Sequence, residues 1–188
     1  MAGILSTGLA LLACLGVAQA VFIPHPYTHD THAHRASLAP RGSPACGSKP
    51  KWAFDNSGHF TEGTVVAGNQ RTYLVHIPGD FDNAVPRPLV LSFHGADGTA
   101  QHQEEASQLS LPGQTIAGRS IVAVYPQGLP GNGRSAAWEA APYADPNAHD
   151  VDFTLAIIDE VVSALCIDIT RIYVSGKSNG GGFVRAIS

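Results

Sequence analysis

Residues 172–183 read IYVSGKSNGGGF, and this stretch decides the fold. Its apolar start predicts a buried strand, which runs into a Gly-x-Ser-x-Gly motif centred on Ser178 and then into a helix. A strand, a sharp turn at a serine and a helix form a nucleophile elbow, which holds the hydroxyl exposed and strained. Gly176 and Gly180 lack a Cβ, so strand and helix can close tightly around the turn. The helix N-terminus favours negative charge, and we expect the Asn179 N–H to donate to an oxyanion.

A second stretch upstream, residues 89–96, reads LVLSFHGA. Its continuous apolar run predicts another buried strand, which ends at His94-Gly95. The loop after such a strand must bring a backbone N–H close to a carbonyl oxygen, and Gly95 permits that approach. We therefore assign the second oxyanion donor to Ala96. A catalytic base is one interpretation of His94, but we favour a loop-shaping histidine, because the base of such a site normally follows the nucleophile.

The rest of the chain alternates short strand patterns with helical ones. Apolar or β-branched runs bounded by glycine or proline predict strands at 63–68, 71–77, 120–125 and 171–175, the first two joined by a turn at Gly68-Asn69. Helices are predicted at 101–109 and 152–165. Strands that alternate with helices predict an α/β fold, a sandwich of three layers.

The second predicted helix has the clearest periodicity. Four apolar residues recur at helical spacing and should share one buried face: Leu155, Ile158, Val162 and Leu165. Asp150 or Asp152 is expected to cap its N-terminus, and Asp152 is expected to have only this structural role.

The N-terminal segment reads as a secretion signal. Residues 1–20 carry no charged side chain and end on Ala18-Gln19-Ala20, a small-x-small cleavage pattern. A membrane anchor is the alternative, but the apolar run is short and no basic cluster follows it. We predict a signal peptide at 1–20 and a secreted, extracellular protein. Residues 21–45, with four prolines, predict a flexible leader or propeptide.

Histidines and cysteines leave two questions open. The leader holds four histidines, His25, His29, His32 and His34, which could ligate a metal. We favour the alternative of a polar stretch without a metal, because nothing rigid orients the rings. Signal cleavage would leave Cys46 and Cys166, which could pair with each other or with cysteines outside this chain.

Composition excludes several classes of protein. The 188 residues include 15 acidic and 11 basic ones, for a net charge of −4, so the basic face of a nucleic-acid binder is not expected. Hydrophobic residues make up 44%, which rules out a disordered tail.

Several blocks in order resemble a known family. They are RTY at 71–73, HG at 94–95, YPQG at 125–128, DVDF at 150–153 and GKSNGG at 176–181. The chain resembles secreted esterases related to polyhydroxybutyrate depolymerases, above all the fungal feruloyl esterases of the C/D type, from about Cys46 to Phe183. The resemblance implies an α/β-hydrolase fold and a Ser-Asp-His triad with Ser178 as nucleophile. It also implies that Trp138 lines the substrate groove or packs a loop.

The same resemblance implies the substrate and partners. It implies hydrolysis of ferulate or related hydroxycinnamate esters on plant cell-wall polysaccharide such as xylan, with no metal or organic cofactor. Separately, we expect a monomer with no membrane or nucleic-acid partner. The elbow alone does not distinguish an acetyl-xylan esterase or a polyhydroxyalkanoate depolymerase. A non-catalytic secreted binding protein is the third alternative, although binding does not need the elbow serine that the chain retains.

The chain departs from the family after the nucleophile. The family places the triad acid and base after the serine, yet residues 179–188 contain no Asp, Glu or His, and all nine histidines precede Ser178. We therefore expect residues 46–188 to be the N-terminal portion of a larger esterase domain, with negligible activity alone. Cys166 is expected to lack its partner too.

Overall fold

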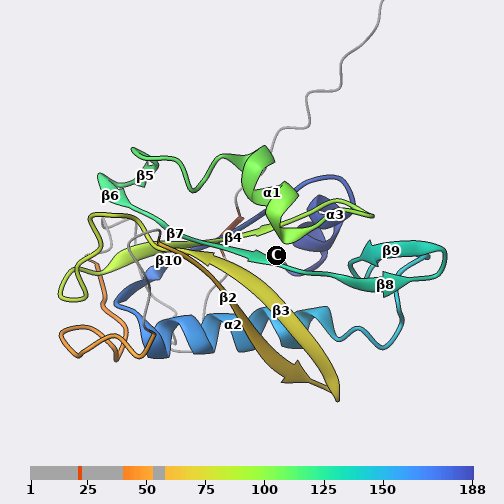
Figure 1. The fold of residues 1–188 in the computed structure, drawn as a ribbon, viewed down its shortest axis with the longest axis horizontal. Helices are drawn as coiled ribbons and strands as arrows, with labels where there is room; N and C mark the ends of the chain where they lie inside the picture. Colours follow the sequence, from red (N-terminus) through yellow and green to blue (C-terminus); the bar gives the residue numbers. More distant parts are fainter. Residues whose placement is uncertain (1–20, 23–39, 53–57) are drawn as a thin grey trace, which may run out of the picture.

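The computed structural model describes residues 21–22, 40–52 and 58–188, which form an α/β fold around one mixed sheet. The six strands follow the order β1-β10-β4-β7-β3-β2, with helices on both sides of the sheet (Figure 1). The predicted signal peptide and the four leader histidines lie outside the described residues. Within the described ranges, no helix has the length and apolar character needed to cross a membrane.

The centre of the sheet is three parallel strands, as the apolar runs predicted. β4 (Arg87–Phe93) lies between β10 (Ile167–Gly176) and β7 (Val122–Pro126) and pairs in parallel with both. Every residue of β4 and β7 is buried, because helices cover both faces of the sheet there. The predicted α/β fold with buried strands is confirmed.

Antiparallel strands complete both edges of the sheet. On one side β3 (Asn69–His76) pairs with β7, and β2 (His59–Val66) forms a hairpin with β3. On the other side β1 (Val21–Phe22) pairs with β10. The hairpin turn lies at Ala67-Gly68, where φ is 49° and 83°, one residue before the predicted Gly68-Asn69. A two-residue hairpin of type I′ needs positive φ at both central positions, which sets this register.

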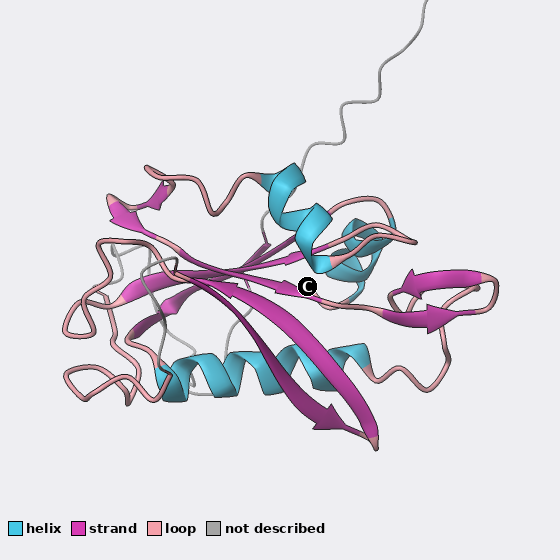
Figure 2. Cartoon of the chain, viewed as in Figure 1, coloured by secondary structure: helices cyan, strands magenta, loops and turns pink. Residues whose placement is uncertain are grey.

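Three helices cover the sheet. α1 (Ala100–Ser107) lies on one face and α2 (Asp150–Ala164) on the other (Figure 2). α3 (Asn179–Ala186) follows β10 and adds Phe183 and Val184 to the hydrophobic cluster that α2 also fills. Two small hairpins complete the described chain: β5 (Thr115–Ile116) with β6 (Arg119–Ser120), and β8 (Leu129–Gly131) with β9 (Arg134–Ala137).

The packing of α2 corrects two predictions. Leu155 is 41% exposed, whereas the other three residues of the predicted face are buried: Ile158, Val162 and Leu165. A further buried row at Phe153, Ile157 and Val161 widens the face on the side away from Leu155. Neither aspartate caps the helix: the N-cap residue is His149, in a left-handed conformation and without a side-chain cap.

Asp150 is instead buried and pairs with Arg71. An Arg71 guanidinium nitrogen lies 2.7 Å from Asp150 Oδ1, and both side chains are fully buried. Arg71 also donates to the Ala148 carbonyl at 2.8 Å, and Asp150 Oδ2 accepts from the Glu139 N–H at 2.8 Å. These bonds compensate part of the desolvation cost of the two charges. The pair therefore ties β3 to the start of α2.

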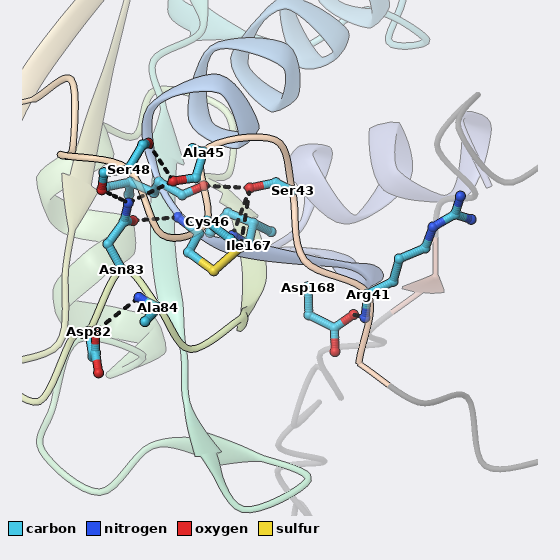
Figure 3. Close-up of a disulfide and its surroundings, with 12 residues drawn as sticks. Arg41, Ser43, Ala45, Cys46, Ser48, Asp82, Asn83, Ala84, Ile167 and Asp168 are labelled. Carbon is cyan, nitrogen blue, oxygen red and sulfur yellow. Dashed lines mark hydrogen bonds between the residues drawn. A yellow bond between two sulfur atoms is a disulfide. The ribbon is translucent and has the colours of Figure 1, made fainter.

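A disulfide joins Cys46 to Cys166, so the expectation that Cys166 lacks a partner is wrong. Figure 3 shows the polar contacts around it: Ser43 Oγ donates to the Leu165 carbonyl at 2.7 Å, and Asn83 Oδ1 accepts from the Cys166 N–H at 2.7 Å. The Ser43 N–H also donates to the Ile167 carbonyl at 2.8 Å. Residues 41–45 belong to the range assigned to the leader, yet they hydrogen bond to the start of β10.

Reduction of this disulfide is expected to destabilise the polypeptide of residues 21–188 strongly. The bond closes a loop with a sequence separation of 120, and the chain-entropy model gives such a loop about 4 to 5 kcal/mol of unfolding free energy. Urea unfolding with and without reductant measures the difference. The double variant Cys46→Ser/Cys166→Ser should have the same urea midpoint as the reduced protein, and reductant should not change that midpoint. An unchanged urea midpoint on reduction would contradict the expectation.

Candidate active site

Ser178 lies at a sharp turn between a strand and a helix. β10 ends at Gly176 and α3 begins at Asn179, so the turn occupies only two residues. Ser178 has φ 51° and ψ −117°, a conformation that L-residues rarely adopt, and its side chain is exposed. Such a conformation costs about 1 to 3 kcal/mol and persists only where the surroundings impose it.

Two glycines impose the turn by close backbone contact. A Cβ on Gly180 would lie 2.4 Å from the Phe93 carbonyl oxygen and 2.5 Å from that of His94. A Cβ on Gly176 would lie 2.4 Å from the Gly180 carbonyl carbon. The contacting atoms are backbone atoms, which cannot swing away. The first turn of α3 therefore rests directly on the end of β4, and no residue other than glycine fits there.

Alanine at position 180 tests this contact. We expect Gly180→Ala to lower the free energy of unfolding by about 2 to 3 kcal/mol, because an overpacked backbone must shift. Gly182→Ala is the matched control: a Cβ there has open space within 4 Å, and alanine should add up to about 1 kcal/mol to helix stability. Urea unfolding of both variants gives the two values. Equal stability of the variants would contradict the steric account.

The same edge of the sheet carries the predicted oxyanion donors. Gly176 lies opposite Phe93 in the parallel register, so the loop after β4 and the elbow meet. A Cβ on Gly95 would be 3.4 Å from Ser178 Cβ, which places this loop against Ser178. In the described ranges, the N–H groups of Ala96 and Asn179 have no hydrogen-bond acceptor. Both are therefore available to a developing oxyanion.

His94 is buried behind this loop and holds its shape. Its Nδ1 lies 2.7 Å from the Gly95 carbonyl oxygen, and its Nε2 accepts from the Gly128 N–H at 3.0 Å. Because Nε2 accepts this bond, Nδ1 carries the proton and donates to Gly95. Burial lowers the pKa of His94, which favours this neutral form. Both ring nitrogens are thus engaged by backbone, as a loop-shaping histidine requires.

Asn179 fixes the neighbouring segment through its side chain. Its Oδ1 accepts from the Trp138 N–H at 2.9 Å, and its Nδ2 donates to the Trp138 carbonyl at 3.2 Å. Trp138 is fully buried, stacks on Phe183 and donates its indole N–H to the His94 carbonyl at 2.8 Å. A groove-lining role for Trp138 is therefore wrong. It packs the loop, which is the other role that we considered.

A pocket of about 590 Å³ opens beside Ser178. Sequence reasoning missed three of its lining residues: His102 on α1, Arg134 on β9 and Tyr143. Arg134 donates to Asp97 at 2.7 Å, and its guanidinium lies 5.0 Å from the Tyr143 ring centre. The Arg134 hydrogen bond is the main cause that lowers the pKa of Asp97. No local motif marks these residues, because separate loops bring them together. The whole lining is His94, Gly95, Ala96, Asp97, Gly98, His102, Gln103, Ala106, Arg134, Tyr143, Lys177 and Ser178.

Within the described residues, no base is positioned beside Ser178. In the part of the chain that the structure describes, Ser178 Oγ has no hydrogen-bond partner. Two histidines line the pocket, but both His94 ring nitrogens are already bound, and His102 has no carboxylate within hydrogen-bond distance there to orient it. The arrangement can place an acyl group against Ser178 and stabilise an oxyanion.

Comparisons with known proteins agree with this geometry. Residues 107–188 match the model of the prolyl oligopeptidase family. The chain is 32% identical over 112 residues to feruloyl esterase B of Piromyces equi, covering 60% of this chain and 20% of the relative. It is 30% identical over 149 residues to feruloyl esterase C of Emericella nidulans, covering 78% and 48% respectively.

A solved structure, the crystal structure of a thermostable esterase, shares the fold with a TM-score of 0.52 at 20% identity, covering 68% of this chain and 36% of the other. The chain spans from a fifth to about half of the length of the two feruloyl esterases. The chain is thus similar in sequence to proteins named as esterases and, over residues 107–188, to the prolyl oligopeptidase family.

Proposed function

We propose that this chain carries the nucleophile and the oxyanion donors of a secreted feruloyl esterase. The observation that carries the proposal is the conformation of Ser178, which is strained and exposed and lines one pocket with Ala96, while Asn179 follows it in the chain. Serine attacks an ester carbonyl, and the two N–H groups stabilise the negative charge that develops on its oxygen. A protein that only bound a ligand would have no use for this strain.

The proposed substrates are ferulate and related hydroxycinnamate esters on plant cell-wall xylan. Relatives named feruloyl esterase B and C support the acyl group. The pocket supports it too, since 590 Å³ lies within the range of small-molecule sites, and Arg134, His102 and Tyr143 offer polar and aromatic contacts. The uncharged segment that ends on a small-x-small pattern at residue 20 supports secretion.

The polypeptide of residues 21–188 should turn over methyl ferulate very slowly. Loss of a catalytic base costs about 10⁴-fold or more in rate. Free imidazole can enter the open pocket and act as the base, so it should accelerate hydrolysis of p-nitrophenyl ferulate at least about tenfold over the Ser178→Ala variant. Release of p-nitrophenol measures both rates.

Ser163→Ala serves as the control, because Ser163 lies on α2 and does not line the pocket. It should keep the full imidazole-dependent rate. Ordinary turnover of methyl ferulate without imidazole would contradict the prediction that residues 21–188 lack a positioned base. An equal imidazole-dependent rate in Ser178→Ala would contradict the proposal that Ser178 is the nucleophile.

The acyl preference is tested with p-nitrophenyl esters of ferulate, acetate and 3-hydroxybutyrate under the same conditions. The Ser178-dependent rate should be highest for ferulate, by about tenfold, because the aromatic acyl group has the most surface to bury in the pocket. A higher rate for acetate or 3-hydroxybutyrate would replace the feruloyl assignment with one of the two other esterase types.

A further inference from the structure

Two histidines and a glutamate meet outside the candidate active site. His59 Nε2 lies 2.9 Å from His76 Nδ1, and His59 Nδ1 lies 3.2 Å from Glu104 Oε1. One ligand atom from each of the three residues lies within 4.8 Å of the other two. None of the three side chains lines the pocket beside Ser178. Glu104 lies on α1, and other residues of that helix do line the pocket.

The fold brings these side chains together from three elements. His59 begins β2 and His76 ends β3, and the two are directly opposite in the antiparallel register. Opposed residues of a hairpin project from the same face of the sheet. α1 packs on that face and presents Glu104 to His59. The cluster therefore depends on the register of the hairpin and on the position of α1.

The distances suit a small transition-metal ion. Bonds of about 2.0–2.1 Å in a tetrahedral site separate ligand atoms by about 3.3 Å. The two short contacts use different nitrogens of His59, only one of which can bind a given ion. With one ligand atom from each residue, the three atoms lie within 4.8 Å of one another, so the side chains need to draw only slightly closer around an ion. Two imidazoles and a carboxylate form a ligand set that zinc uses, with a fourth position for water. His59 is 39% exposed, so an ion can enter from solvent.

Glu104 gives a second indication. Its Oε1 is buried and, in the described ranges, accepts no hydrogen bond, although it lies 3.2 Å from the His59 ring. A buried carboxylate oxygen without a donor is unfavourable. A cation between the carboxylate and the two rings would supply the missing interaction.

We propose that His59, His76 and Glu104 bind Zn²⁺. The ion would clamp α1 onto the β2–β3 hairpin. α1 also carries His102, Gln103 and Ala106 into the pocket, so the clamp would hold one wall of the pocket in place. The bonds form by displacement of water from the ion, and the imidazoles bind in their neutral form.

Isothermal titration of the mature chain with ZnCl₂ tests the site. His76→Asn and Glu104→Gln should each weaken the site at least about tenfold, since even outer-shell changes cost 10–100-fold. His149→Asn is the matched control, because His149 is also exposed beside a carboxylate, that of Asp152, at 3.3 Å. The leader histidines are the same in all variants. Equal affinity in all four proteins would overturn the proposal.

A measurement on the unmodified sequence covers the case in which a variant fails to fold. Diethylpyrocarbonate modifies accessible neutral imidazoles, and peptide mass spectrometry locates the products. Saturating Zn²⁺ should reduce modification of His59 at least about fivefold and leave His149 unchanged, since a metal-bound nitrogen cannot react. Equal modification of His59 with and without Zn²⁺ would overturn the site.

Discussion

The first turn of α3 touches the end of β4 through backbone atoms alone. Gly180 lies so close to the Phe93 and His94 carbonyls that a single added carbon would overlap both. The contact sets where β10 must end and where α3 must begin, and the chain between them reverses at Ser178 with a positive φ. The strain at Ser178 is thus imposed by the packing of α3 on β4, and it persists for as long as these two elements stay packed.

The same contact explains the polar arrangement around the site. With α3 seated on β4, Asn179 reaches the backbone of Trp138, and Trp138 reaches the His94 carbonyl. His94 then holds the Gly128 backbone and its own loop. These bonds are buried, apart from the partly buried one between His94 and Gly95, so the loop that carries Ala96 has little freedom. The loop is therefore held by the protein itself, as the proposed role of its N–H group in a preorganised oxyanion site requires.

Local patterns predicted much of this fold, and long-range packing accounts for what they missed. The parallel strands and the elbow could be predicted because apolar runs and a Gly-x-Ser-x-Gly motif are contiguous. Leu155 was assigned to the buried face because spacing alone does not show where the stripe begins on a helix. The burial of Trp138, the Arg71–Asp150 pair and the pocket wall at Arg134 each join residues distant in sequence. No single window of sequence contains that information.

The central claim is that Ser178 attacks an ester and becomes acylated. Deacylation needs a base to activate water, so in residues 21–188 the acyl group should remain on the serine once it is attached. Mass spectrometry of the protein after incubation with p-nitrophenyl ferulate and imidazole measures this directly. We predict one feruloyl group on the peptide that contains Ser178 and none in Ser178→Ala. An unlabelled Ser178, or a feruloyl group that persists in Ser178→Ala at the same level, would contradict the account.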